Sequence, residues 1–186
     1  MPEPRLIEVR KNVLKHNDVV ARSLRDRFRA SGVFVASLVS SPGSGKTAFL
    51  EKTLTLLRPD YRVAALVGDL ATENDAVRLA RSKAPVKQIT TGTLCHLEAA
   101  MVENALADWN LHELDFLFIE NVGNLSAAVE FRWDTAYANI QAVRTGMQVF
   151  QLSSKTGAGM NEFLKFLGTR LAEIRQSRQL ACASTP

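Results

Sequence analysis

The sequence predicts an α/β fold of three layers, in which helices cover both faces of a mostly parallel sheet. Two observations carry this prediction. Short apolar runs alternate with segments of helical spacing along most of the 186 residues, as in parallel sheets with crossover helices. The first apolar run is followed at once by a turn that ends in Gly45-Lys46-Thr47, as in a phosphate-binding loop that opens a helix. We therefore expect the P-loop NTPase form of this fold.

Five runs of β-branched, aromatic and other apolar residues have the length and composition of buried strands. They predict strands at residues 33–39, 62–67, 85–90, 114–119 and 148–152. Polar or glycine residues follow each run, which is where a parallel sheet presents its ligand-binding loops. The run at 85–90 contains a lysine and a glutamine and predicts the weakest of these strands.

Around the runs, apolar residues recur at the three- and four-residue spacing of an amphipathic helix. This spacing predicts one or two helices at 6–29, and further helices at 47–57, 73–81, 97–109, 136–144 and 161–179. The turn Arg58-Pro59-Asp60 ends the helix after the phosphate loop, because proline cannot continue a helix. We expect an N-terminal helical segment at 1–31, one P-loop domain at 32–179 and a disordered polar tail at 180–186.

Composition and charge disfavour several classes of protein. The formal charge is +4 but dispersed, and the one densely basic segment, 22–29, alternates with apolar residues like a solvated helix, which argues against a nucleic-acid partner. Two cysteines give no disulfide framework, no run is long and apolar enough to span a bilayer, and residues 1–5 lack a signal-peptide core. We expect a cytoplasmic protein with no membrane partner, and with His16 and His112 on its surface.

The segment directly after the first strand reads S-S-P-G-S-G-K-T and predicts a triphosphate site. Gly43 and Gly45 let the backbone around Ser44 turn its N–H groups toward one point, and the following helix adds the positive end of its dipole. Lys46 can reach the β- and γ-phosphate oxygens, and the hydroxyl of Thr47 can ligate Mg²⁺. A plain glycine–serine turn is the alternative, but the strand before the segment and the helix after it favour nucleotide binding.

Two strands deliver carboxylates to the same edge of the sheet. The second strand is followed by Asp69 and the fourth by Glu120, with Gly123 three residues later. In a P-loop protein a carboxylate at this edge can bind Mg²⁺, directly or through water, or orient the attacking water. Gly123 can present its N–H to the γ-phosphate, because it has no side chain to block close approach. The alternatives are that Asp69 caps the next helix and that Glu120 lies in a surface turn.

Cys95 and His96 follow the third strand and offer a thiolate and an imidazole, which suit Zn²⁺ or Ni²⁺. Two ligands do not close a metal site, but a two-fold dimer would double them to four. Taken alone, such a pair is more often structural than metal-binding.

The loop at 153–159, after the fifth strand, is a second glycine-rich entry to a helix. It can line a purine-base pocket through backbone N–H groups and the stem of Lys155. A plain helix-entry loop fits the same residues equally well.

Five segments of the chain read S-S-P-G-S-G-K-T, V-G-D-L-A-T-E-N-D-A, I-T-T-G-T-x-C-H-L-E-A, F-I-E-N-V-G-N-L and L-S-S-K-T-G-A-G-M. Their combination closely resembles the HypB family of hydrogenase/urease nickel incorporation proteins, which are P-loop GTPases of the SIMIBI class. The resemblance implies a Mg²⁺-dependent GTPase that binds GTP, carries Ni²⁺ or Zn²⁺, and forms a homodimer on nucleotide or metal binding. It further implies nickel insertion into a NiFe hydrogenase, with a HypA-like nickel-delivery protein and the hydrogenase large subunit as partners.

Carried over residue by residue, the resemblance implies three sets of site residues. The catalytic residues are Lys46, Asp69 and Glu120. The nucleotide-binding residues are Gly43, Ser44, Gly45, Lys46, Thr47, Gly123, Ser154 and Lys155. The metal ligands are Cys95 and His96 for Ni²⁺ or Zn²⁺, and Thr47 and Asp69 for Mg²⁺.

The chain departs from this family after its fourth strand. The family has a Cys-Pro dipeptide after E-N-V-G-N-L, which supplies a third metal ligand, and two further strands that lead to the base-reading motif N/T-K-x-D. Here Leu125 continues directly into 126–131, and the chain contains no such motif. The pattern is that of an internal deletion. It predicts a shortened sheet with an exposed apolar edge, unless the strand at 148–152 pairs beside the first.

The same departure predicts weak discrimination between guanine and adenine, and weaker metal binding. The alternative function is a catalytically impaired module that only dimerises and binds metal or a partner. A urease accessory GTPase and a small-molecule kinase are further alternatives. The Cys95-His96 pair and the E-N-V-G-N-L segment favour HypB over a urease accessory GTPase. No acceptor-site or lid pattern in the sequence supports a small-molecule kinase.

Overall fold

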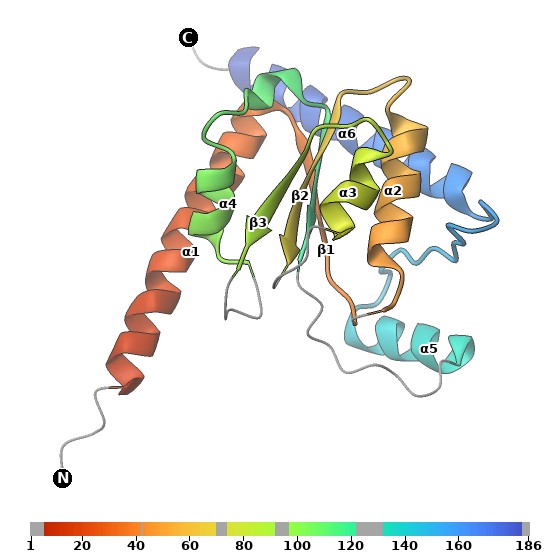
Figure 1. Ribbon diagram of the computed structural model, residues 1–186, viewed down its shortest axis with the longest axis horizontal. Helices are drawn as coiled ribbons and strands as arrows, with labels where there is room; N and C mark the ends of the chain where they lie inside the picture. Colours follow the sequence, from red (N-terminus) through yellow and green to blue (C-terminus); the bar gives the residue numbers. More distant parts are fainter. Residues whose placement is uncertain (1–5, 42, 70–73, 92–96, 122–131, 184–186) are drawn as a thin grey trace.

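A computed structural model describes residues 6–41, 43–69, 74–91, 97–121 and 132–183, and within these ranges the chain forms the expected α/β fold (Figure 1). The described sheet has four strands in the order β1 (Phe34–Leu38), β4 (Phe116–Glu120), β2 (Val63–Asp69) and β3 (Val86–Thr90). Every neighbouring pair is parallel, with Phe116 opposite both Phe34 and Val63. The predicted parallel sheet is confirmed.

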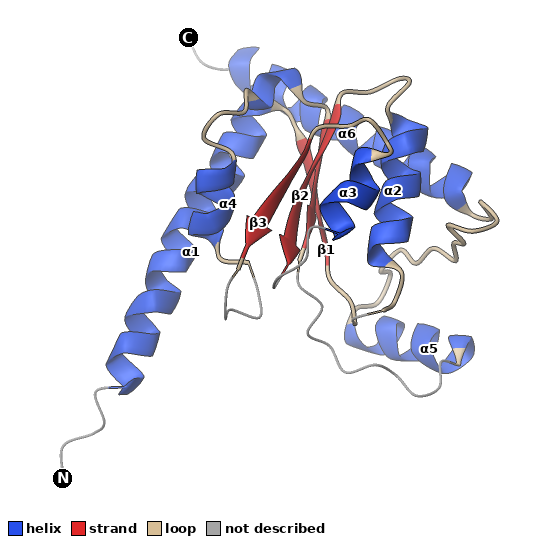
Figure 2. Cartoon of the chain, in the orientation of Figure 1, coloured by secondary structure: helices blue, strands red, loops and turns tan. Residues whose placement is uncertain are grey.

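Helices cover both faces of this sheet (Figure 2). α1 (Leu6–Ser31) and α4 (Ala99–Ala105) pack on one face, and α2 (Lys46–Leu57), α3 (Asn74–Ala80) and α6 (Met160–Ala183) pack on the other. A short 3-10 turn, η1 (Leu111–Glu113), leads into β4. α5 (Trp133–Val143) lies on the side of the molecule where the strands end, and it buries none of its residues.

Residues along each strand point alternately into two cores. In β2, Ala65 and Val67 belong to the core under α2, α3 and α6, whereas Ala64 and Leu66 belong to the core under α1 and α4. β2 has a strand on each side and helices on both faces, which is why every residue from Val63 to Gly68 is buried. A strand that is buried on both faces reads as a continuous apolar run, and the run at 62–67 therefore predicted β2 correctly.

The strand predicted at 148–152 is wrong, because these residues form no strand. Phe150 instead packs against the rings of Phe163 and Phe166 in α6, with ring centroids 5.5 and 5.1 Å apart. The segment therefore buries its aromatic side chain against a helix, and its backbone does not pair with the described sheet.

Several helix boundaries differ from those predicted. The helix expected at 97–109 is confined to α4, whose start is fixed by Asn17 of α1: the Asn17 Oδ1 accepts a hydrogen bond from the Ala99 N–H at 2.7 Å. This satisfies one of the donors that a helix start leaves unpaired. α5 begins at Trp133 rather than at residue 136. α6 runs on to Ala183, so the prediction of a disordered tail from residue 180 is wrong for residues 180–183.

The buried carboxylate of Asp115 ties the starts of three strands to α6. Its Oδ2 accepts a hydrogen bond from the Arg62 backbone N–H at 2.6 Å, and its Oδ1 pairs with the guanidinium groups of Arg62, at 3.3 Å, and of Arg175. Its backbone accepts from the Phe34 N–H at 2.9 Å and donates to the Arg62 carbonyl at 2.8 Å. Asp115 is thus the node that joins β1, β2, β4 and α6 at the end of the sheet opposite the carboxyl ends.

Candidate functional site

The phosphate loop connects the end of β1 to the start of α2, as the sequence predicts. Gly43 and Gly45 have φ values of 72° and 88°, in the left-handed region that favours glycine. A Cβ built on either residue meets no atom of the described chain within 4 Å. Glycine is therefore needed at both positions for the backbone conformation and not because a side chain would collide with the described chain.

Lys46, the first residue of α2, lies folded back along this loop. Its Nζ donates to the carbonyl oxygen of Ser41 at 3.2 Å and is 3.4 Å from that of Ser40. The hydroxyls of Ser40 and Ser44 are hydrogen-bonded at 2.5 Å, and the Ser44 N–H donates to the Ser41 carbonyl at 3.3 Å. These bonds hold the loop closed and keep the ammonium group of Lys46 beside it.

Thr47 and Glu120 meet at the carboxyl end of the sheet. The Thr47 hydroxyl donates to Glu120 Oε1 at 2.8 Å, and the two residues are only 9% and 3% exposed. The register places Glu120 between Leu38 of β1 and Val67 of β2, which is directly beside the start of the phosphate loop. Glu120 therefore ends a buried strand and does not lie in a surface turn. This places two hard oxygen groups at one edge of the sheet: a hydroxyl of the kind that can ligate Mg²⁺, and a carboxylate that can accept a hydrogen bond from a water molecule.

Asp69 is the last residue of β2, opposite Thr90 of β3, so its backbone ends at the same edge as Glu120. The side chain of Asp69 lies outside the described part of the chain, as do Cys95, His96 and Gly123. Their roles as ligands remain predictions. His16 and His112 are exposed, as expected. Among the described residues, no cluster of three or more histidine, cysteine and acidic side chains forms a metal site.

The residue that follows the Cys95-His96 pair is held against this same edge. The Leu97 N–H donates to Asn121 Oδ1 at 2.9 Å, one residue past the end of β4. A Cβ built on Gly68 in β2 would lie 2.6–2.9 Å from three carbon atoms of the Leu97 side chain, so Gly68 is what lets Leu97 pack on the strand. Gly68, Leu97 and Asn121 are positioning residues that the sequence reasoning missed. A glycine inside an apolar strand was the available signal.

The loop at 153–159 lies beside α2, with which it lines a cavity. Ser153 and Ala158 close it through a hydrogen bond of 2.9 Å from the Ser153 N–H to the Ala158 carbonyl. A cavity of about 460 Å³ opens beside it. Its lining residues come from α2, α3 and the loop, and they are Ala48, Glu51, Lys52, Thr55, Arg78, Ser154 and Lys155. The two predicted base-contact residues thus lie next to the first turns of the helix that the phosphate loop opens.

No helix in the described ranges combines the length and the apolar character needed to cross a bilayer.

Residues 34–170 match the family model described as the CobW/HypB/UreG nucleotide-binding domain. The chain is 46% identical over 123 residues to a hydrogenase/urease maturation factor HypB of Helicobacter hepaticus, an alignment that covers 64% of this chain and 50% of that protein. It is 44% identical over 131 residues to a hydrogenase maturation factor HypB of Azotobacter vinelandii, covering 70% and 43%. The chain thus spans about half the length of the curated relatives it matches.

Two solved structures share the fold. The crystal structure of HypB from Helicobacter pylori in complex with nickel superimposes with a TM-score of 0.74 at 29% identity, over 85% of this chain and 96% of that one. HypB from Archaeoglobus fulgidus superimposes with a TM-score of 0.73 at 24% identity, over 84% and 99%.

Proposed function

The chain belongs to the CobW/HypB/UreG family of nucleotide-binding domains, and on that premise we propose that it is a Mg²⁺-dependent GTPase of hydrogenase maturation. The buried hydrogen bond between Thr47 and Glu120 supports this most directly. It joins the last residue of the phosphate-loop motif to a carboxylate at the carboxyl end of β4, where a nucleotide triphosphate and its metal ion meet in P-loop proteins.

Each group of this site has a role in phosphoryl transfer to water. The N–H groups of the phosphate loop and the ammonium of Lys46 would bind the β- and γ-phosphate oxygens. Thr47 and Asp69 would hold Mg²⁺, which supplies charge neutralisation at the γ-phosphate when it is bound. Glu120 would orient the attacking water by accepting a hydrogen bond from it.

We propose nickel as the cargo, held by Cys95 and His96 and completed by the same pair from a second copy. The nickel complex of the Helicobacter pylori relative supports the choice of metal. The anchoring of Leu97 by Gly68 and Asn121 ties the residue after the metal pair to the strands that present Asp69 and Glu120. Nucleotide turnover can therefore be coupled to metal release toward a HypA-like protein or a hydrogenase large subunit. A reducing compartment such as the cytoplasm would keep the Cys95 thiol available.

A nucleotide-turnover assay tests the proposal. Lys46→Ala removes the ammonium group that would bind the transferring phosphate, so we expect GTP hydrolysis to fall by about 100-fold or more. Lys165→Ala is the control, because Lys165 is an exposed lysine of α6 that lies outside the phosphate loop and does not line the cavity beside Ser154 and Lys155. If the parent protein shows no turnover above the Lys46→Ala variant while still binding nickel, the chain is the non-hydrolysing metal-binding module instead.

The absence of an N/T-K-x-D motif leads to a second prediction, which concerns the choice of nucleotide base. A site with a carboxylate for the guanine N1 and N2 hydrogens rejects adenine strongly, and this chain has no such motif. We expect GTP and ATP to compete with affinities within about tenfold of each other. A competition titration with a labelled GTP analogue measures this, and a preference for GTP of about a thousandfold would show that another residue reads the base.

A further inference from the structure

β1 is an edge of the described sheet, with β4 on one side only. The Phe34 N–H donates to the Asp115 carbonyl at 2.9 Å, and the Leu38 carbonyl accepts from the Asn121 N–H at 3.0 Å. Because backbone groups alternate along a strand, the even-numbered residues of β1 pair with β4 and the odd-numbered Val35 and Ser37 present their N–H and C=O groups outward. No described strand pairs with that side.

This edge lacks the features that usually prevent further pairing. β1 reads F-V-A-S-L, without a charge, a proline or a glycine, and no bulge interrupts its register with β4. The apolar segment expected to cover it, at 148–152, packs on α6 through Phe150 instead. The Ser37 side chain is exposed, and the Val39 side chain just past the strand is 59% exposed. Within the described ranges, a ladder of backbone donors and acceptors thus faces outward, where another extended chain could pair with it.

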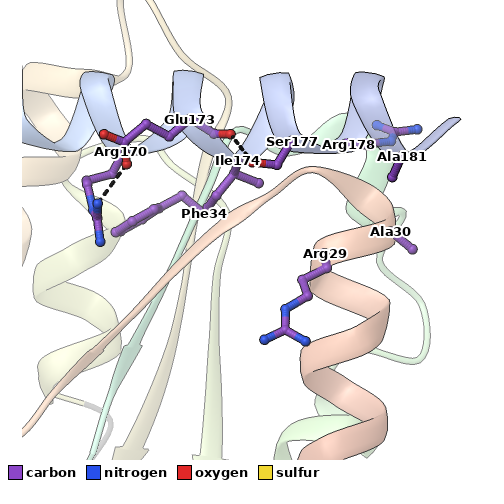
Figure 3. Close-up of a pocket in the computed structure, with 9 residues that line it drawn as sticks. All are labelled: Arg29, Ala30, Phe34, Arg170, Glu173, Ile174, Ser177, Arg178 and Ala181. Carbon is purple, nitrogen blue, oxygen red and sulfur yellow. Dashed lines mark hydrogen bonds and ion pairs between the residues drawn. The ribbon is translucent and has the colours of Figure 1, made fainter. Parts of the chain in front are cut away.

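A cationic groove adjoins the start of this edge. It has a volume of about 810 Å³ and lies between the end of α1, the first residue of β1 and α6 (Figure 3). Phe34, Ala30 and Ile174 give it an apolar lining, and Arg29, Arg170 and Arg178 project around it. Glu173, the carboxylate of this lining, pairs with Arg170 at 2.7 Å, and Asp26, outside the lining, pairs with Arg29 at 3.4 Å. Arg178 donates to the Ser31 carbonyl at 3.3 Å, so the groove carries the net positive charge of this guanidinium beside two solvent-exposed ion pairs.

We propose that the β1 edge and this groove form a docking site for an extended, acidic segment of a partner polypeptide, which adds to the sheet as a fifth strand. The backbone groups of Val35 and Ser37 would supply the hydrogen bonds of strand addition. Carboxylates at the end of the segment near Phe34 would pair with Arg29 and Arg178. A second copy of the chain is the less suitable occupant, because it would bring an identical arginine-rich groove and a net charge of +4 toward this one.

The test uses a fluorescein-labelled peptide with alternating valine and threonine at its centre and a run of glutamates at one end, in both orientations. A peptide with glutamines in place of the glutamates is its control. We expect one acidic peptide to bind without added nucleotide and about tenfold more tightly than the glutamine peptide. Hydrogen exchange at the amides of Val35 and Ser37 should slow on binding, while the amides of Ala36 and Leu38 are protected throughout.

Two pairs of variants distinguish strand addition from adhesion to a charged surface. Ser37→Pro removes only an outward N–H, which an edge strand tolerates, and should lower the affinity for the acidic peptide by about tenfold or more. Ser37→Thr keeps this donor and should bind the peptide with the affinity of the parent protein. Arg29→Glu should weaken binding by about tenfold, and Arg25→Glu, one turn earlier on α1 and exposed outside the groove, should not. A thermal melt checks that each variant folds.

Three outcomes overturn the proposal. Equal binding of the acidic and glutamine peptides, or unchanged exchange at Val35 and Ser37, shows that the edge does not add a strand of this chemistry. Self-association of the parent protein that is lost in Ser37→Pro assigns the edge to a second copy. Because the assay contains no nucleotide, none of these results depends on the GTPase activity proposed above.

Discussion

Replacing Asp115 with alanine is expected to lower the free energy of unfolding by about 3 kcal/mol. The substitution leaves the Arg62 backbone N–H without its acceptor and breaks the ion pairs with Arg62 and Arg175 at a side chain that is 9% exposed. The two guanidinium groups are themselves partly exposed and regain water, which keeps the loss below that of a fully buried pair. Urea denaturation at neutral pH measures the change.

Asp108→Ala is the matched control. Asp108 also pairs with a cation, Lys87, but its side chain is 71% exposed, so its removal should change the stability little. If Asp115→Ala and Asp108→Ala lower the free energy of unfolding equally, the buried contacts of Asp115 stabilise the fold no more than an exposed ion pair does.

The pH dependence of Asp115 follows from the same contacts. Burial acts to raise the pKa of the carboxyl, but hydrogen bonds from the Arg62 backbone, from Arg175 and from the Arg62 side chain outweigh it, so the pKa lies below its usual value. A lowered folded-state pKa contributes stability above the unfolded value of about 3.9, and this stability is lost as the pH falls through the folded pKa. The stability difference between the parent and Asp115→Asn should therefore shrink below about pH 4. A constant difference from neutral to acidic pH would contradict this.

Local sequence signals predicted the parts of the molecule that depend on neighbouring residues. The glycines of the phosphate loop and the apolar runs of β2 and β4 specify their own conformations, and the structure has them where expected. Thr47 and Glu120 are far apart in sequence, yet both were expected at one edge, since parallel strands present their carboxyl ends together.

Features that depend on distant partners could not be predicted in this way. The segment at 148–152 is apolar enough for a strand, but whether Phe150 packs on β1 or on α6 depends on the placement of α6. The start of α4 depends on Asn17, which approaches from another helix. Nothing in the sequence around Asp115 indicates that Arg175 meets it. In the site, the contact of Leu97 with Gly68 is equally non-local, and it was missed for the same reason.

Gly159→Ala is expected to cost roughly 3 kcal/mol of stability and to open the loop that carries Ser154 and Lys155. Gly159 has a φ of 71°, and a Cβ built on it would lie 2.0 Å from the carbonyl oxygen of Gln151. The obstacle is backbone, so no side-chain rotation can relieve it. The loop must separate from the preceding segment, at the expense of the hydrogen bond between Ser153 and Ala158.

Gly157→Ala is the matched control, because it isolates the steric contact from the backbone conformation. Gly157 lies in the same loop with a φ of 82°, but a Cβ built on it meets no described atom within 4 Å. It should therefore cost only about 1 kcal/mol, which is the penalty of the left-handed conformation alone. If Ser154 and Lys155 bind the base as we propose, nucleotide affinity should fall in Gly159→Ala and stay near the parent value in Gly157→Ala. Equal losses of stability in the two variants would show that the loop relaxes around the added methyl group, and that its closure does not depend on Gly159.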